Sequence, residues 1–584
     1  MKILLTAINA KYIHSNLAVY SLKAAAGEYK EYVEIAEFTI NNQADYILKE
    51  IYKREPDILM FSCYIWNLDI IEKVMREFHK LCPEVRIWLG GPEVSYEETA
   101  FMEAHPEVTG VMLGEGEVTF RELCEYYYGK YYNRYVRVAS LAEIEGIAYR
   151  RMYSSFKEIR LTPWRTPMNM SDIPFAYDRA EDFSNRIIYY ESSRGCPFSC
   201  SYCLSSVDKK LRFRDLKLVK EELQFFIDQK VPQVKFVDRT FNCHHEHAMA
   251  IWQYILEHDN GITNFHFEVS ADLINEAELE LMSKMRPGLI QLEIGVQSTN
   301  EETIKEIKRT MKLERLKEIV KKVKSFGNIH QHLDLIAGLP YEDYDTFRKS
   351  FQEIYELQPN QLQMGFLKVL KGSYMFEHAD EYGILYHDDP PYEVLKTNWL
   401  SYEDVLNMKH IEEMLEVYYN SGQYEITMKV LGTYFENAFD MFRKIGDYYE
   451  EHGLFGMSHS RIRRCKILLE FLQKEWAKEP TLEERMMCVK EALVFDLYYR
   501  ENCKSRPNWA VDCGSFKTIT HFYCKNGKMS HIEPFHYDFI GGDYAYQDEP
   551  MWVKFSYDKR NPLSHQAFVE CVDPKHDMQQ EENE

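Results

Sequence analysis

Short apolar runs alternate with amphipathic stretches over the first part of the chain. The runs KILLTAI, DILMFSCYIW, VRIWLGGPE and VTGVMLGEGE are each followed by a segment with helical periodicity, such as NLDIIEKVMREFHKL. Strands that alternate with helices in this way are typical of βαβ units, which build a parallel sheet with helices on both faces. The pattern therefore predicts a Rossmann-like α/β domain over residues 1–130.

Glycine-containing loops follow two of these predicted strands. LGGPEVS places Gly90 and Gly91 after one strand, and LGEGEVTF places Gly114 and Gly116 after the next. The carboxyl ends of strands in an open α/β sheet are where ligands bind. No GxGxxG follows the first strand, so the fingerprint of a dinucleotide site is absent from its expected place.

A second α/β region follows a segment of different composition. Residues 131–185 are rich in proline and polar residues and predict a hairpin-like connector, with a domain boundary near Tyr177. Over residues 186–372 the alternation resumes, and six parallel strands with right-handed crossovers predict an open sheet or an incomplete barrel. The candidate strands are IIYYES, QVKFVDR, NFHFEVSA, LIQLEIGVQ, IHQHLDLIAGLP and QLQMGFLKVL. The polar residues at their carboxyl ends, where barrel chemistry is located, are Glu191, Asp238, Glu268, Gln297 and Asp343.

The remaining residues, 373–584, show long helical periods with Tyr and Phe on their apolar faces. Examples are MKHIEEMLEVYYN and RRCKILLEFLQKEWAKE, and no repeat of fixed period is present. The pattern predicts a mostly helical C-terminal domain. The final residues, DMQQEENE, form an acidic tail that is predicted to be disordered.

Composition narrows the class of protein. The formal net charge is −23, and the only notable Lys/Arg-rich run has helical periodicity with interspersed glutamates, so binding to nucleic acid is not predicted. No run of about 18 apolar residues suggests a membrane span. The opening MKILLTAINA does not resemble a signal peptide. The 13 cysteines are scattered and odd in number, which favours reduced thiols and a cytoplasmic location.

Three of those cysteines lie within eight residues. The stretch ESSRGCPFSCSYCLSS contains Cys196, Cys200 and Cys203. A structural zinc site usually takes four ligands as paired CxxC elements, and no nearby Cys or His completes such a set here. The segment NCHHEH is more typical of a polar loop and a helix start. A cubane iron–sulfur cluster held by three thiolates keeps one iron open for a small chelate, so the spacing favours a cluster over zinc or purely structural cysteines.

The cysteine stretch resembles a known family motif. CPFSCSYC is similar to the CxxxCxΦC motif of the radical S-adenosylmethionine (AdoMet, SAM) superfamily, with Tyr202 as the aromatic residue Φ. The resemblance implies a [4Fe–4S] cluster on Cys196, Cys200 and Cys203, with the amino and carboxylate groups of AdoMet on the open iron. One electron, from a donor such as flavodoxin or ferredoxin, then cleaves AdoMet to a 5′-deoxyadenosyl radical that abstracts hydrogen from a substrate.

The resemblance extends to residues on later strands. Asp238 lies where this family places groups that bind AdoMet, and Glu268 and Ser270 lie where a carboxylate meets the ribose hydroxyls. LEIGVQS, which contains Gln297, resembles the fourth strand, and LDLIAGLP the fifth. Arg309 resembles a basic residue that reaches the AdoMet carboxylate. The alternative for each is a strand-end polar residue that satisfies loop backbone.

The N-terminal region resembles the cobalamin (B12)-binding domains that often precede this kind of core. The resemblance rests on FSCYIW, WLGGPEVS, GEGEVTF and IEGIAYR. Small residues would let a flat corrin ring and its nucleotide tail approach the edge of the sheet. The residues implied in cobalamin binding are Ser62, Gly90, Gly91, Gly114 and Gly116.

One expected cobalamin motif does not match. Proteins with a histidine on cobalt carry DxHxxG after the first strand, whereas here Tyr12 and Leu17 take the Asp and Gly positions around His14. We therefore expect cobalamin without a protein histidine on the metal, and a structural role for His14.

The whole arrangement resembles a cobalamin-binding radical SAM protein with a C-terminal domain of unknown role. Its implied fold is a Rossmann-like domain, a partial (β/α)6 barrel and a helical domain. The implied activity is methyl transfer to an unactivated carbon of a small-molecule or peptide substrate, with methylcobalamin as the donor and a second AdoMet to restore it. The alternatives are rearrangement or cyclisation, a radical SAM enzyme without catalytic cobalamin, and a non-catalytic iron–sulfur regulatory protein.

Overall fold

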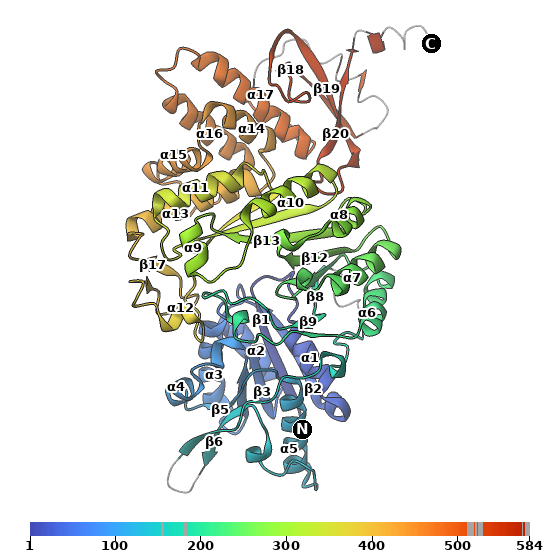
Figure 1. Ribbon diagram of the computed structural model, residues 1–584, viewed down its shortest axis with the longest axis vertical. Helices are drawn as coiled ribbons and strands as arrows, with labels where there is room; N and C mark the ends of the chain where they lie inside the picture. Colours follow the sequence, from blue (N-terminus) through green and yellow to red (C-terminus); the bar gives the residue numbers. More distant parts are fainter. Residues whose placement is uncertain are drawn as a thin grey trace.

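Three parts of the chain lie in sequence order along the longest axis of the molecule (Figure 1). The computed structural model describes residues 1–152, 157–178, 185–510, 519, 522–523, 529–574 and 576–578. Residues 579–584 of the acidic tail lie outside the described residues. None of the helices within the described ranges is long and apolar enough to span a membrane.

The N-terminal domain is a doubly wound α/β fold. Its parallel strands pair in the order β2-β1-β3-β4-β5, an order that is typical of open sheets with a ligand site at the point where strand order reverses. All seven residues of β1 are buried, as expected for a strand covered by helices on both faces. The strands are β1 Ile3–Asn9, β2 Val33–Thr39, β3 Ile58–Ser62, β4 Arg86–Gly90 and β5 Val108–Met112. The helices are α1 Leu17–Ala25, α2 Ala44–Lys53, α3 Leu68–Leu81, α4 Glu98–Ala104 and α5 Glu117–Tyr132.

A hairpin lies within the segment expected to be a connector, and it extends the first sheet. Strand β6 (Ile147–Met152) pairs antiparallel with β5 and with β7 (Lys157–Leu161). The N-terminal sheet therefore has seven strands among the described residues, five of them parallel.

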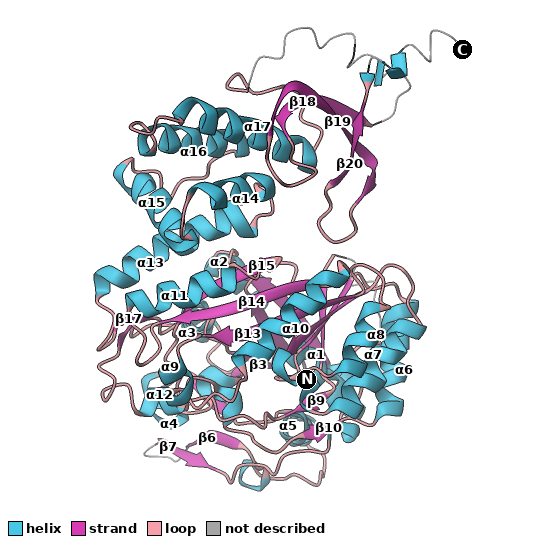
Figure 2. Cartoon of the chain, turned by 45° about the horizontal axis from the view of Figure 1, so that its top comes forward, coloured by secondary structure: helices cyan, strands magenta, loops and turns pink. Residues whose placement is uncertain are grey.

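The second part is a sheet of six parallel strands in the order β15-β14-β13-β12-β11-β8. Helices lie outside these sequential parallel strands (Figure 2). The sheet is a partial barrel, because β8 and β15 do not pair with each other. The strands are β8 Ile187–Tyr190, β11 Gln233–Phe236, β12 Asn264–Val269, β13 Ile290–Gln297, β14 His330–Ala337 and β15 Gln361–Phe366. The helices are α6 Leu216–Asp228, α7 His245–Glu257, α8 Glu276–Ser283, α9 Glu301–Glu306, α10 Leu313–Phe326 and α11 Tyr344–Tyr355. The predicted α/β class and the partial barrel are confirmed.

Both outer strands of the barrel are covered by other parts of the chain. The Ile187 amide of β8 donates to the Ile13 carbonyl (2.6 Å), and the Ser15 hydroxyl donates to the Ile187 carbonyl (2.9 Å). On β15, the Asn420 side chain accepts from the Leu362 amide (3.0 Å) and donates to the Leu362 carbonyl (2.8 Å). The edge groups that an open barrel exposes are thus partly satisfied within the chain.

The C-terminal part is mostly helical, as predicted, and it also carries a sheet that was not predicted. A π-helical turn, Glu416–Asn420, continues α13 and presents Asn420 to the barrel. The small elements are α12 Tyr374–Glu377, β16 Leu385–Tyr386 and β17 Val394–Lys396. The main helices are α13 Tyr402–Leu415, α14 Glu425–Tyr434, α15 Ala438–Glu451, α16 Arg461–Glu475 and α17 Leu482–Arg500. The antiparallel strands are β18 Ser530–Tyr537, β19 Tyr546–Arg560 and β20 Ala567–Val572.

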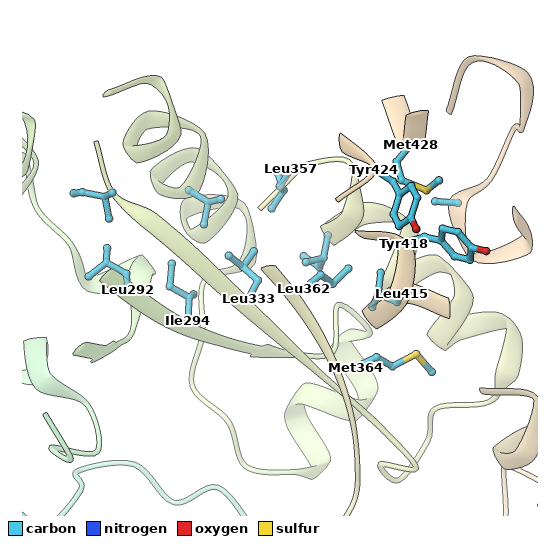
Figure 3. Close-up of a cluster of buried hydrophobic side chains, with 14 of the residues drawn as sticks. Leu292, Ile294, Leu333, Leu357, Leu362, Met364, Leu415, Tyr418, Tyr424 and Met428 are labelled. Carbon is cyan, nitrogen blue, oxygen red and sulfur yellow. The ribbon is translucent and has the colours of Figure 1, made fainter. Parts of the chain in front are cut away.

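The C-terminal helices share one apolar core with the barrel. Leu333 of β14 and Leu362 of β15 belong to the same buried cluster as Leu415 and Tyr418 (Figure 3). Each of these side chains is fully buried. Because burial of a large apolar side chain contributes about 1.5–3 kcal/mol, this continuous core holds the C-terminal helices firmly on the barrel.

Candidate active site

A cavity of about 750 Å³ lies between the carboxyl edge of the N-terminal sheet and the carboxyl edge of the barrel. Its N-terminal wall comes from the ends of β1, β3, β4 and β5, and its opposite wall includes Tyr189, Val237 and Arg239 of the core. The small residues expected at the cobalamin site all line it: Ser62, Gly90, Gly91, Gly114 and Gly116.

The glycines on this wall serve two purposes. Gly91 has φ of 117°, and a Cβ there would lie 2.3 Å from the Cys63 carbonyl oxygen, so the backbone itself requires glycine. Gly90 has no such constraint, since its nearest neighbour would be the flexible Met112 side chain at 3.3 Å. Glycine at position 90 therefore keeps the wall of the cavity bare.

Aromatic rings complete the wall. The rings of Tyr64 and Trp66 stack with centroids 4.4 Å apart and an interplanar angle of 6°, and the Trp66 indole donates to the Ile8 carbonyl (3.1 Å). Bare glycine backbone beside flat rings fits a large flat ligand such as a corrin. His14 also lines the cavity, with its Nδ1 2.7 Å from the Tyr189 hydroxyl. Burial lowers the pKa of His14.

The three cysteines lie in a loop that is bracketed by a small ribbon. Strand β9 (Ser193–Arg194) pairs antiparallel with β10 (Arg212–Phe213). Between them, a Cβ on Gly195 would lie 2.5 Å from the Lys210 carbonyl oxygen. Cys196 and Cys200 are buried, and Cys203 is half-buried. Burial raises the pKa of the Cys196 thiol, and the neighbouring Cys203 and Cys200 thiols raise it further.

No single-ion site is present among the described residues. No three His, Cys, Asp or Glu side chains in those ranges converge closely enough to hold one metal ion. In the NCHHEH segment, His245 contacts Glu278 (2.9 Å), His247 contacts the Ser192 hydroxyl (3.0 Å), and His244 caps α7. Hydrogen bonding within the fold accounts for these histidines.

Unsatisfied polar atoms lie beside the cysteines. The Arg309 guanidinium donates to the Cys200 sulfur (3.8 Å), the Tyr202 hydroxyl (3.4 Å) and the Gly295 carbonyl. The Arg309 Nε and the Gln297 Oε1 are buried and have no hydrogen-bond partner among the described residues. A β-bulge between Gly295 and Gln297 and a φ of 75° at Gln297 set this geometry. Orphaned polar atoms next to three thiols fit a polar ligand such as AdoMet.

Asp238 supports the cysteine loop. Its carboxylate accepts from the Ser192 amide (2.9 Å), the Ser192 hydroxyl (2.7 Å) and the Ser193 hydroxyl (2.5 Å). Burial raises the pKa of Asp238 to about 6. Ser270 is also engaged locally, because its hydroxyl donates to Asp272 (2.8 Å). Asp343, also noted at a strand end, caps α11 through the Thr346 amide. The structure thus gives each of the three a local structural contact.

Glu268 faces the interior of the barrel with an unshared carboxylate. Burial and the nearby Glu293 carboxylate together raise its pKa to about 7, while Arg239 opposes the rise. Glu293 is itself paired with Lys235 (2.8 Å), and no hydrogen bond or ion pair joins Glu268 to another described side chain. Glu268 is therefore available to accept hydrogen bonds from a ligand.

A clamp of ion pairs joins the two edges, and it was not predicted from the sequence. Glu117 accepts from Arg194 (2.5 Å), and Glu115 accepts from Arg212 (2.6 Å), so the GEGE loop binds the ribbon around the cysteines. Burial alone would raise the pKa of Glu117, but Arg194 holds it below its ordinary value. Arg194 also pairs with Glu191 (2.8 Å). The sequence signal was two acidic residues in the glycine loop and two arginines flanking the cysteines.

Three family models match the chain. The B12 binding domain matches residues 3–124, the radical SAM superfamily matches residues 190–354, and the protein of unknown function family DUF4080 matches residues 380–536. The chain is 26% identical over 318 residues to the 2-(S-pantetheinyl)-carbapenam-3-carboxylate methyltransferase of Streptantibioticus cattleyicolor. It is 27% identical over 322 residues to the cobalamin-dependent radical SAM methyltransferase TokK of Streptomyces tokunonensis. Each alignment spans 52% of this chain and 45% of the relative.

Solved structures share the fold. OxsB, a cobalamin-dependent S-adenosylmethionine radical enzyme, aligns with a TM-score of 0.58 and 16% identity over 85% of this chain and 80% of its own. TsrM from Kitasatospora setae, a radical S-adenosylmethionine methyltransferase with cobalamin and a [4Fe–4S] cluster bound, aligns with a TM-score of 0.52 and 16% identity. That alignment covers 67% of this chain and 79% of TsrM. The chain is therefore a radical SAM protein with an N-terminal B12-binding domain and a C-terminal DUF4080 domain.

Proposed function

We propose that this chain is a cobalamin-dependent radical SAM methyltransferase that acts on an unactivated carbon of a small-molecule or peptide substrate. The observation that carries the proposal is the single cavity bounded by the carboxyl edges of both sheets. Cobalamin held by the N-terminal wall would supply a methyl group to this cavity, and a cluster with AdoMet held by the adjoining core would supply the radical. The methyltransferase relatives support this choice among the chemistries of the fold.

The chain's residues take distinct parts in holding the cofactors. Cys196, Cys200 and Cys203 hold the cluster, and Tyr202, Asp238, Glu268, Ser270, Gln297 and Arg309 form the AdoMet site. Ser62, Gly90, Gly91, Gly114 and Gly116 form the cobalamin wall. When bound, these groups supply a 5′-deoxyadenosyl radical and a transferable methyl group. A one-electron donor such as flavodoxin or ferredoxin would supply the electron that the cluster needs.

The protein positions these groups by rigid contacts. Asp238 fixes the start of the cysteine loop through Ser192 and Ser193. Arg309 holds its guanidinium against Cys200 and Tyr202, so its free Nε points to a fixed place. The Glu117–Arg194 pair fixes the distance between the two walls. Preorganised contacts of this kind let a reaction proceed without rearrangement of the site.

The test is anaerobic incubation of reconstituted protein with reductant, AdoMet carrying a deuterated methyl group, and cell extract. Mass spectrometry should find 5′-deoxyadenosine and a product with one labelled methyl group. The variant in which all three cysteines become alanine should give neither compound. A labelled product formed equally by that variant would contradict the proposal, and so would 5′-deoxyadenosine without any methylated product in every extract.

A further inference from the structure

One cationic side chain lies in the cavity without a partner. Arg239 follows β11 and lines the cavity from the core side, where it is exposed. No hydrogen bond or ion pair joins its guanidinium to any other residue in the described ranges. Its charge opposes the rise in the pKa of both Glu191, which also lines the cavity, and Glu268 of the predicted AdoMet site.

The remaining charges of the cavity are compensated. Its lining contains three carboxylates, from Glu115, Glu117 and Glu191, and each is paired with Arg194 or Arg212. Arg239 is thus the one charged side chain of the lining that has no partner in the described part of the chain. The chain holds 93 acidic and 70 basic residues, so the lack of a partner for Arg239 does not come from a shortage of carboxylates. A guanidinium that no carboxylate of the lining occupies is free to bind an anion from outside the protein in the bidentate geometry that favours carboxylates and phosphates.

The backbone on both sides of Arg239 is fixed. Asp238 is held by Ser192 and Ser193, and the Thr240 hydroxyl lies 3.9 Å from the Cys196 sulfur. Arg239 is therefore anchored next to the cysteine loop while its own side chain stays free. The fixed backbone keeps the Cα of Arg239 at the edge of the cavity, and its planar guanidinium matches a carboxylate or phosphate in its bidentate mode.

We infer that Arg239 binds an anionic group, a carboxylate or a phosphate, of the methyl acceptor. The inference rests on the proposed function and names the chemical class of its substrate. The two cofactors are the competing sources of an anion. Arg309, beside Cys200, is the predicted partner of the AdoMet carboxylate, whereas Arg239 lines the cavity together with Tyr64 of the opposite wall. Neither cofactor is needed to explain Arg239.

Protection from phenylglyoxal tests the inference without a known substrate. Holoprotein with cluster and hydroxocobalamin is treated with the reagent, and modification of each arginine is followed by peptide mass spectrometry. Inorganic phosphate serves as the anion. We expect phosphate to slow modification of Arg239 several-fold and to leave unchanged the modification of Arg76, an exposed arginine of α3 without a described partner. Arg194, which is half-buried and paired, should react slowly throughout.

Further arms of the same experiment distinguish the sources of the anion. Holoprotein is compared with and without AdoMet, and apoprotein with and without hydroxocobalamin. Arg239 should stay reactive in each case. Protection by AdoMet alone or by hydroxocobalamin alone would assign Arg239 to that cofactor and overturn the inference. Equal protection of Arg239 and Arg76 by phosphate would overturn it as well.

Product analysis adds a second readout. Fragmentation of the methyl-labelled product from extract in the mass spectrometer should show a carboxylate or a phosphate group, and a product with neither group would contradict the inference. Loss of a charge-assisted contact predicts a roughly ten- to hundredfold fall in labelling by Arg239→Gln, with partial recovery in Arg239→Lys. Arg76→Gln should label like the wild type, and equal labelling by Arg239→Gln would contradict the inference. If no variant labels any product, the proposed function fails, while the protection experiment still decides the role of Arg239.

Discussion

The two walls of the cavity are built from opposite kinds of material. The N-terminal wall is backbone and flat rings, with Gly90 and Gly91 at its centre and Tyr64 stacked on Trp66. The barrel side presents charged side chains, Glu191, Arg194 and Arg239, and the half-buried Glu268 and Arg309 of the proposed AdoMet site lie outside the lining of the cavity. The proposed function gives the N-terminal wall a large flat ligand that needs bare backbone, and gives the barrel a small ligand that needs polar side chains.

This difference determines how each site responds to substitution. A site made of bare backbone is blocked by any added bulk, and its own groups contribute little specificity. A site made of buried polar groups depends on individual hydrogen bonds, each of which can be removed without changing the shape of the pocket. The predicted effects therefore range from complete loss of a cofactor to small shifts in affinity.

The largest effect is expected at the cysteine loop. Replacing Cys196, Cys200 and Cys203 together by alanine should abolish iron binding, because the cluster loses every protein ligand. Cobalamin content should stay near that of the wild type, since the cobalamin wall belongs to another domain. Iron analysis measures the cluster content, and the absorption spectrum measures the cobalamin content. Cys571→Ala, at an exposed free cysteine, is the control and should keep its full cluster. A cluster retained by the triple variant would contradict the assignment.

The second largest effect is expected on cobalamin binding at the N-terminal wall of the cavity. Gly90→Phe should reduce cobalamin retention to less than about a tenth, because the ring would occupy space that the ligand needs. The cluster should remain. Gly432→Phe is the control, since no atom lies within 4 Å of a Cβ at that position. Position 91 is unsuitable for this test, because a Cβ there strikes the Cys63 carbonyl and disturbs the fold itself. Unchanged cobalamin content in Gly90→Phe would remove Gly90 from the site.

The same contrast explains which features are predictable from the sequence. The three cysteines lie within eight residues, so their spacing alone indicates a cluster. The alternating burial of β13 follows directly from its sequence, LIQLEIGVQ. Strand and helix periods of this kind depend on neighbours in the chain, so the amino-acid pattern is enough to predict the Rossmann-like domain and the barrel.

Features that depend on distant residues escaped prediction. Glu117 and Arg194 are 77 positions apart, and each alone resembles a solvated loop residue. The orphaned Nε of Arg309 follows from a bulge at Gly295 that no local pattern encodes. The C-terminal sheet was missed because Pro534 interrupts β18 and the first part of β19 is charged, which is typical of loops.

Breaking the Glu117–Arg194 ion pair should lower the free energy of unfolding by an amount between the effects above and the one below. Glu117→Gln leaves Arg194 without its main buried partner, and removing one member of a buried pair costs about 3 kcal/mol. Urea denaturation should show this loss in the free energy of unfolding. The control is Glu77→Gln, whose exposed pair with Lys80 contributes less than about 0.5 kcal/mol. Equal effects of the two substitutions would mean that the clamp does not hold the walls together.

The smallest effect is a pH dependence of AdoMet binding. Burial raises the pKa of Glu268 from 4.5 to about 7, so the folded protein loses stability from this group as the pH rises between those values. Ionised Glu268 accepts stronger hydrogen bonds from ribose hydroxyls than the neutral acid does. AdoMet affinity should therefore rise roughly three- to tenfold between about pH 6 and about pH 8.

Equilibrium binding of AdoMet to reconstituted holoprotein, measured anaerobically over this range, tests the role of Glu268. The variant Glu268→Gln keeps the size and polarity of the side chain but cannot ionise, so its AdoMet affinity should not rise with pH in the same way. Comparison with this variant also corrects for titration of AdoMet itself, because that titration affects wild type and variant equally. Affinities of wild type and variant that change in parallel with pH would show that Glu268 does not contact the ligand. The carboxylate would then belong with Lys235 and Glu293 to the packing of the barrel interior.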